Sequence, residues 1–239
     1  MNPVQDASLV APPLTACRVV VTGGLGVLGR AVGELLAARG ARVLLLDRAP
    51  AQDVPGMAAV LGGVDLADEA AANAAMLEAG HRLGGLNALV NVAGGFRWEK
   101  VDGGSLATWD ALYGMNLRSA VAACGAAVPL LRASAPASIV NVGALGAVKA
   151  GAGMGAYAAS KAGVARLTEA LADELKDEGV RVNAVLPSIL DTPANRADMP
   201  DADASRWVAP AQLAAVIAFL LSADAAAVTG ACLPVAGRV

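Results

Sequence analysis

Histidine and aromatic side chains are scarce in this chain. Its 239 residues include one histidine, His81, and aromatic residues make up only 3% of the sequence. One histidine excludes a multi-histidine metal centre, so we expect no metal, and it leaves a serine-hydrolase triad a single candidate base. Because His81 stands between Gly80 and Arg82 near an expected helix end, we expect it on the surface rather than in catalysis.

Clustered positive charge and paired cysteines are also missing. The 18 Lys and Arg residues are outnumbered by 21 Asp and Glu residues, and no stretch collects a basic stripe, so we expect no nucleic-acid partner. Cys17, Cys124 and Cys232 are odd in number and far apart, which excludes a disulfide framework and CxxC metal spacing. We expect them to be small buried residues of a protein in the reducing cytoplasm.

The chain has no signal-peptide pattern and no long uninterrupted apolar run. Residues 1–15 lack a basic start and contain Asp6 and two prolines, so we expect a flexible N-terminal tail. The longest stretch without a charged residue or histidine lies between Arg206 and Asp224, and Pro210 interrupts it. We therefore expect no membrane partner.

Short apolar runs alternate instead with longer alanine-rich stretches. Strands that are apolar at nearly every position have both faces covered, and intervening helices make parallel βαβ units. We predict an α/β fold over residues 16–239, a single-domain, Rossmann-like, doubly wound parallel sheet with helices on both faces. The expected strands are residues 17–22, 41–47, 58–66, 86–95, 137–143, 180–187 and 231–237.

Prolines and composition mark the remaining segments. Helices are expected up to residues 39 and 79 and over residues 109–131, 157–178 and 210–221. Pro210 suits the first turn of the last helix, and Pro234 removes a ladder donor, which indicates an edge strand. The acidic stretch 191–205 is either a mobile lid over a site or a solvated loop.

A glycine turn follows the first expected strand. Gly24, Gly26 and Gly29 complete a GxGxxG pattern that follows a strand and opens a helix. A dinucleotide pyrophosphate needs such a tight turn, close backbone approach and free helix N–H groups. Asp47 ends the second strand, where it can accept hydrogen bonds from ribose hydroxyls and repel a 2′-phosphate. This favours NAD over NADP, although the adjacent Arg48 can soften the repulsion.

Tyr157 and Lys161 are four residues apart on an expected helix, so their side chains share one face. A free tyrosine has a pKa near 10, and a neighbouring ammonium lowers it toward the range where proton transfer works at neutral pH. We therefore interpret the pair as proton-transfer machinery.

From Cys17 onward the chain resembles the short-chain dehydrogenase/reductase family. The markers are the TGG turn, Asn91-Val92-Ala93-Gly94, the YAASK segment, and single residues in the family's order: Asp65, Asn116, Pro187 and Thr192. The resemblance implies that Tyr157 donates or accepts the proton, that Lys161 lowers its pKa and binds the nicotinamide ribose, and that Asn116 holds a water in a proton relay. It also implies that Thr192 contacts the carboxamide and that the protein is a homotetramer or homodimer. The expected cofactor-binding residues are Gly23, Gly24, Gly26, Val27, Leu28, Asp47, Arg48, Asp65, Leu66, Asn91, Ala93, Gly94, Tyr157, Lys161, Pro187, Ser188, Leu190 and Thr192.

Three positions depart from the family pattern. Val27 stands where a glycine is usual, with the glycine moved to Gly26, and Ser188 replaces a glycine after Pro187. Ala144 occupies the position of the family's substrate-polarising serine, 13 residues before the tyrosine. Loss of one such donor typically costs about 10²–10³ in rate.

The substrate pocket is expected to include Ala144 together with Trp98, Lys149 and Trp207, with Phe96 and Arg97 beside Trp98. Lys149 and Ser188 are the candidates to replace the missing serine hydroxyl.

We expect an NAD(H)-dependent oxidoreductase that acts on a small carbonyl, alcohol or conjugated imine substrate. One alternative is a quinonoid dihydropteridine reductase-like activity, because the GGxGxLG turn and the alanine at position 144 are similar to dihydropteridine reductase. An alternative of another class is a catalytically impaired dinucleotide-binding sensor or oligomer partner.

Overall fold

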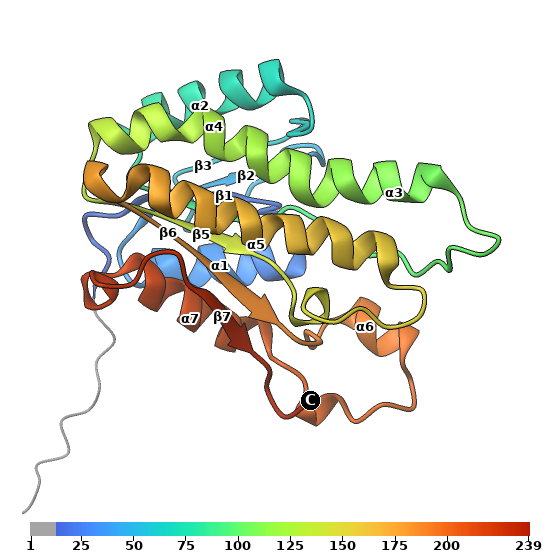
Figure 1. Ribbon diagram of the computed structural model, residues 1–239. Helices are drawn as coiled ribbons and strands as arrows, with labels where there is room; N and C mark the ends of the chain where they lie inside the picture. The colour runs from blue at the N-terminus through green and yellow to red at the C-terminus, as the bar shows by residue number, and fades with distance from the viewer. Residues whose placement is uncertain (1–12) are drawn as a thin grey trace, which may run out of the picture.

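A seven-stranded parallel sheet forms the centre of the protein. The computed structural model describes residues 13–239, and the strands lie in the order β3-β2-β1-β4-β5-β6-β7 (Figure 1). The strands are β1 (Arg18–Thr22), β2 (Arg42–Leu46), β3 (Ala59–Leu61), β4 (Ala88–Asn91), β5 (Ala137–Val142), β6 (Val180–Pro187) and β7 (Cys232–Val235). Every neighbouring pair is parallel, as the βαβ alternation predicted.

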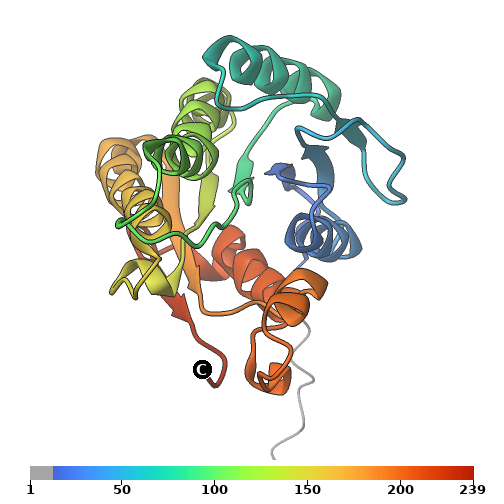
Figure 2. The same cartoon turned by 90° about the vertical axis from the view of Figure 1, so that its right-hand side faces the viewer.

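Helices cover both faces of this sheet (Figure 2). They are α1 (Val27–Ala38), α2 (Glu69–Leu83), α3 (Leu106–Leu112), α4 (Ser119–Ala133), α5 (Gly155–Leu175), α6 (Pro193–Asp198) and α7 (Pro210–Leu221). A π-helix (Tyr113–Arg118) joins α3 to α4, and short 3₁₀ turns lie at Leu145–Ala147, Lys176–Glu178, Ala204–Arg206 and Ala223–Ala225. The doubly wound class is confirmed.

Successive strand residues pack into two separate cores. Val19 and Val21 of β1 pack with α1 and α7, whereas Val20 packs with α2 and α4 on the opposite face. This alternation follows from the two-residue period of a strand, and it explains why strands buried on both faces carry continuous Val and Leu runs. Both cores are rich in alanine, which lets the helices lie close to the sheet.

Two expected boundaries change. Of the tail predicted at residues 1–15, residues 1–12 lie outside the described residues. Leu14 is only 6% exposed, and its amide donates to the Arg39 carbonyl at 2.8 Å, so packing begins before residue 16. The acidic stretch 191–205 contains helix α6, which the prediction missed. Thr192 caps this helix through the Asn195 amide, and Pro193 occupies its first position.

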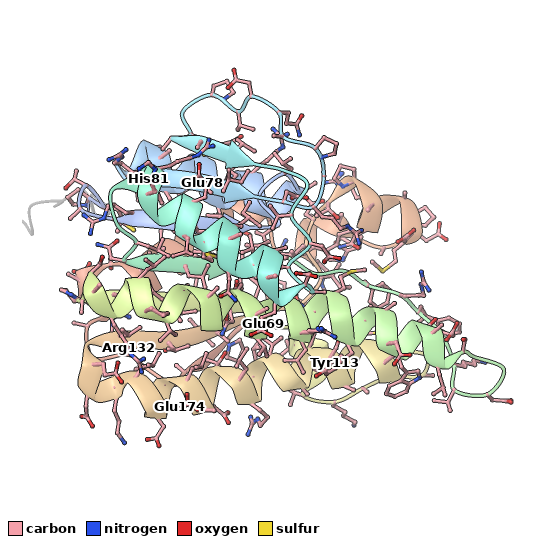
Figure 3. All side chains as sticks on the ribbon, turned by 90° about the horizontal axis from the view of Figure 1, so that it is seen from above. Glu69, Glu78, His81, Tyr113, Arg132 and Glu174 are labelled. Carbon is pink, nitrogen blue, oxygen red and sulfur yellow. The ribbon has the colours of Figure 1, made fainter. Side chains whose placement is uncertain are left out.

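His81 is exposed on α2 near Glu78 (Figure 3), as expected. Cys124 is fully buried, and Cys17 and Cys232 are partly buried.

The continuous helical segment Leu106–Ala133 is long and apolar enough to cross a membrane by length and composition, but 44% of its most apolar window is buried. Its α4 part supplies Ala123, Ala127 and Leu131 to one core of the domain.

Candidate active site

A cavity of about 1670 Å³ opens at the carboxyl ends of the central strands. It lies between β1 and β4, where the strand order reverses, which is where doubly wound sheets bind their ligands. Its volume exceeds the usual 300–1,000 Å³ of a small-molecule pocket, so it has room for more than one small ligand. Residues 194, 195, 198 and 199, in and just after α6, form part of its wall, so the acidic stretch is more than a solvated loop.

The glycine turn forms one end of the cavity. A Cβ on Gly29 would lie 2.1 Å from the Gly23 carbonyl oxygen, and a Cβ on Gly23 would lie 2.8 Å from Ala93. Gly26 caps α1 without a side chain, and the first amides of a helix have no intrahelical partner. Glycine at positions 23 and 29 therefore lets the turn pack tightly against α1 and Ala93, and the turn lines the cavity at the N-terminus of α1, where free amides can bind an anion.

Gly24 was expected to touch the cofactor, but it lies behind the turn rather than on the cavity wall. A Cβ there would come within 2.6 Å of the Leu45 side chain, so Gly24 lets the turn pack against β2. The other expected residues of the turn, Gly23, Gly26, Val27 and Leu28, line the cavity.

Asp47 closes the glycine turn from the end of β2. Its Oδ2 accepts a hydrogen bond from the Leu25 amide and its Oδ1 accepts one from the Ala49 amide, both at 2.9 Å. The carboxylate is thereby fixed on the cavity wall beside Arg48. Asp65 and Leu66 line the same region, and Asp65 accepts a hydrogen bond from the Ala67 amide at 2.9 Å.

Asn91 does not reach the cavity, contrary to the expected cofactor contact. Its Nδ2 donates to Asn141 Oδ1 at 2.9 Å and to Cys124 Sγ at 3.2 Å inside the sheet. Its Oδ1 accepts from the Thr22 hydroxyl, which in turn accepts from the Ala93 amide. Asn91 therefore acts through a buried hydrogen-bond chain that holds Ala93, and Ala93 and Gly94 form the wall.

Tyr157 and Lys161 lie one turn apart on α5 and both line the cavity. Lys161 Nζ donates to the Val142 carbonyl at 2.7 Å, and burial lowers the pKa of this ammonium to about 8. Burial raises the pKa of the Tyr157 phenol above its usual value. The expected lowering of the Tyr157 pKa by Lys161 is therefore not met, because desolvation dominates and the ammonium is held by a main-chain carbonyl.

Asn116 lies in the π-helix and is only 1% exposed, so its side chain does not line the cavity. Its Oδ1 accepts from the Gly95 amide at 2.7 Å, and its Nδ2 donates to the Gly95 carbonyl and to Ser160 Oγ, both at 3.0 Å. This side chain therefore fixes the loop after β4 to α5, and the expected role of Asn116 in holding a relay water stays a prediction. A Cβ on Gly94 would lie 2.6 Å from Asn116 Oδ1, so this junction requires glycine.

The segment after β6 forms another wall through Pro187, Ser188, Leu190 and Thr192. The Ser188 hydroxyl donates to the Ala236 carbonyl at 2.7 Å. Ser188 therefore does not replace the missing serine hydroxyl, because its proton is already engaged.

The expected substrate residues divide into two groups. Ala144 and Trp98 line the cavity, and the Trp98 indole donates to the Ala152 carbonyl at 2.9 Å. Lys149 is exposed and Trp207 is only 7% exposed, and neither of them lines the cavity. Arg97 also points elsewhere, toward the Thr108 hydroxyl at 3.4 Å.

Phe96 is the aromatic neighbour of Tyr157. The two ring centroids are 5.0 Å apart and the ring planes are inclined at 83°. Several further cavity residues were missed because they belong to no recognisable motif; they are Asp110, Met115, Met154, Asn195, Asp198 and Met199.

A family model described as short chain dehydrogenase matches residues 18–203. The chain belongs to the short-chain dehydrogenase/reductase family. A 2,5-dichloro-2,5-cyclohexadiene-1,4-diol dehydrogenase of Sphingobium indicum is 31% identical, over 91% of this chain and 94% of the relative.

Two solved structures of short-chain dehydrogenases share the fold. One from Burkholderia cenocepacia, in complex with NADP, is 32% identical with a TM-score of 0.84 over 94% of this chain and 98% of that one. Carveol dehydrogenase from Mycobacterium avium, in complex with NAD, is 25% identical with a TM-score of 0.83 over 95% and 98% of the two chains.

Short-chain dehydrogenases are oxidoreductases that use nicotinamide cofactors. The residues present here fit such a group, because the glycine turn and the N-terminus of α1 line the cavity, and Asp47 lines it where the second strand ends. Tyr157 and Lys161 line the same cavity as this turn, so a dinucleotide bound at the turn would have room to extend toward them.

Proposed function

We propose that this short-chain dehydrogenase is an NAD(H)-dependent oxidoreductase that transfers a hydride between nicotinamide and a small carbonyl, alcohol or conjugated imine substrate. The observation that carries the proposal is that Tyr157 lines the same cavity as the glycine turn, and that within residues 13–239 its hydroxyl is engaged in no hydrogen bond. Tyr157 is therefore available to give a proton to, or take one from, a substrate oxygen or nitrogen.

The chain's residues divide the remaining work. Gly23, Gly26 and the first amides of α1 bind the pyrophosphate, and Pro187 and Thr192 contact the nicotinamide end. The bound nicotinamide supplies or accepts the hydride. Lys161, which lines the cavity one turn from Tyr157, binds the adjacent ribose.

Asn116 supports the proton relay by positioning Tyr157. Its side chain fixes Gly95 and Ser160, so it holds the loop after β4 against α5 and keeps Tyr157 in place. The relay itself then runs through the hydroxyl of Tyr157 and the ammonium of Lys161.

NAD is the proposed cofactor rather than NADP. Asp47 is held on the cavity wall by two main-chain amides, so it cannot easily swing away from a 2′-phosphate, and its charge opposes that group. The adjacent Arg48 reduces this repulsion without removing the carboxylate.

Ala144 favours a second candidate, reduction of a quinonoid dihydropterin. The alanine is on the cavity wall where the family's serine would polarise a carbonyl. A conjugated imine needs a proton and a hydride more than it needs such a clamp. The same residue supports the competing possibility of a dinucleotide-binding sensor with impaired catalysis.

The assignment is tested with Tyr157→Phe. NADH oxidation and NAD⁺ reduction are measured over a panel of ketones, aldehydes, alcohols and quinonoid dihydropterin. We expect the substituted protein to lose turnover and to retain NADH binding, measured by fluorescence titration. Full turnover with the best substrate would refute the role of Tyr157, and cofactor binding without turnover of any substrate by the unaltered protein would favour the sensor.

Homotetramer or homodimer assembly in the cytoplasm completes the proposal. Leu106, Trp109 and Tyr113 leave an exposed apolar strip on α3 and the π-helix, at 80%, 37% and 54% exposure, which a second copy would cover. Light scattering coupled to size exclusion measures the assembly, and a monomer at micromolar concentration would contradict it.

A further inference from the structure

The cavity wall around Tyr157 is apolar. Phe96 lies edge to face with the Tyr157 ring, and Ala144 and Trp98 line the same cavity. Of the polar groups nearby, the Trp98 indole N–H donates to Ala152 and the Ser188 hydroxyl donates to Ala236. Within residues 13–239 the Tyr157 hydroxyl has no protein acceptor, so it is free to serve a substrate oxygen.

Phe96 and Trp98 are unusually exposed for aromatic residues in so aromatic-poor a chain. Each is 54% exposed, and only two phenylalanines and three tryptophans occur in the sequence. Both side chains are held in place, Phe96 against Tyr157 and Trp98 through its indole and through Gly153, where a Cβ would lie 2.2 Å from the indole ring. Fixed apolar surface at a cavity wall is what a ligand of matching polarity covers.

We propose that Phe96 is a specificity-determining residue that packs against the ring of the substrate, so that the site takes a neutral alcohol or ketone on an apolar ring and rejects polyols. This inference rests on the proposed oxidoreductase function and deepens it. The aromatic side chain offers a flat apolar face, and Ala144 leaves room beside the reacting carbon instead of a hydroxyl.

The chemistry balances with the groups already assigned. In the oxidation direction the ring carbinol carbon loses its hydride to oxidised nicotinamide and its hydroxyl proton to the Tyr157 phenolate, and a C=O bond forms. One substrate oxygen reacts, and Tyr157 takes its proton. Additional ring hydroxyls placed against Phe96, Trp98 and Ala144 would lose water and find no hydrogen-bond partner in these three side chains, and buried polar groups without partners are costly.

The charges on the cavity wall favour a substrate ring without a charge of its own. The carboxylates of Asp110 and Asp198 also line the cavity and are exposed, so they remain hydrated. These carboxylates repel an anionic substrate and give it no binding partner. The cation at Lys161 is held by the Val142 carbonyl.

Two apolar ring alcohols and two polyols test the substrate class. With saturating NAD⁺, kcat/KM of the full-length protein is measured for cyclohexanol and 2-cyclohexen-1-ol, and for myo-inositol and threitol. We expect the apolar ring alcohols to be favoured by about 10²-fold or more, as for an apolar pocket that discriminates against added hydroxyls. Equal turnover, preference for the polyols, or turnover of neither set overturns the inference.

The outcome for the proposed function is read separately. If polyols are oxidised and this activity disappears in Tyr157→Phe, the oxidoreductase assignment stands and only the substrate class fails. If Tyr157→Phe leaves turnover unchanged, the assignment itself fails.

Variants at Phe96 test whether this side chain packs against the substrate ring. The ratio of kcat/KM for cyclohexanol to that for 2-propanol isolates packing of the ring, because 2-propanol has no ring to lose contact. We expect Phe96→Ala to lower this ratio about tenfold, mainly through KM, and Phe96→Leu to lower it less. Phe219→Ala on α7 is the control, since Phe219 is the other phenylalanine, is 41% exposed and does not line the cavity. An unchanged ratio in Phe96→Ala, with the far-ultraviolet spectrum intact, rules out the assigned role.

Discussion

Phe96 meets the ring of Tyr157 edge to face, with centroids 5.0 Å apart and planes at 83°. This geometry is the one that aromatic quadrupoles favour, so it holds the phenol in a fixed orientation. Phe96 also covers one side of the ring, and burial is what raises the pKa of Tyr157.

The first prediction is that Phe96→Ala shifts the pH profile of alcohol oxidation to lower pH. Removing the covering ring lets water reach the phenol, which favours the phenolate and lowers the pKa of Tyr157 toward its usual value. Since oxidation needs the phenolate, kcat/KM should begin to rise at a lower pH in this variant. Phe219→Ala should leave the pH at which kcat/KM rises unchanged. An unchanged or higher pH in Phe96→Ala would show that Phe96 does not raise the pKa of Tyr157.

The second prediction concerns Lys161 and stability. Burial lowers the pKa of Lys161 from 10.5 to about 8, so between these values the unfolded chain binds more protons than the folded protein. The free energy of unfolding should therefore rise with pH across this window, by up to about 3 kcal/mol. Lys161→Met should abolish that rise and remove activity. Urea unfolding at pH 7.5 and pH 10 measures the difference, and equal pH slopes in the two proteins would refute it.

The third prediction is that Asp47→Ser moves cofactor preference toward NADPH. Serine keeps a hydrogen-bond acceptor for one main-chain amide and removes the charge that opposes a 2′-phosphate. We expect the ratio of Kd for NADPH to Kd for NADH to fall about 10–10²-fold. Asp65→Ser is the matched control, because Asp65 also lines the cavity and caps a turn, and it should weaken both cofactors alike.

The fourth prediction is that Ala144→Ser raises kcat/KM toward simple ketones. The new hydroxyl stands on the cavity wall, where Ser188 and Lys149 do not supply a free donor. Restoring one donor to a developing oxyanion is worth up to about 10²-fold. Steady-state assays with cyclohexanone and acetone measure the gain, and its absence would mean that a polarising hydroxyl is not what limits turnover.

The fifth prediction compares two glycines. Gly29→Ala should abolish NADH binding, because its Cβ would lie 2.1 Å from the Gly23 carbonyl oxygen. Gly125→Ala in α4 meets no atom within 4 Å and should stabilise the helix by up to about 1 kcal/mol with binding unchanged. NADH titration and thermal unfolding of both variants are the measurements. NADH affinity retained in Gly29→Ala would contradict the requirement for glycine in this turn.

The strands and the glycine turn were predictable because hydrophobic period and turn chemistry are local. The end of α7 at Leu221 and the edge position of β7 followed from single prolines and apolar runs. Helix α6 also had a local signal, Thr192 before Pro193, which the acidic composition around it concealed.

Other features depend on how distant segments meet. The contact between Phe96 and Tyr157 joins the loop after β4 to α5, 61 positions further along, and no local pattern encodes it. The same is true of Asn91, whose partners Cys124 and Asn141 lie on another helix and strand. Trp207 was misplaced because its burial depends on how the C-terminal segment folds back over it.

Pro234 has a further consequence at the sheet's outer edge. The Ala231 carbonyl accepts a hydrogen bond from the Ala184 amide of β6, and the Val235 carbonyl accepts one from the Ser188 amide just after β6. The backbone groups of these odd-numbered residues therefore face β6, and those of Pro234 face the open side of β7. A strand docking there would find a pyrrolidine ring where it needs an N–H donor. The edge therefore resists templating a continuous intermolecular sheet, which protects a chain this rich in apolar strands from amyloid-like growth.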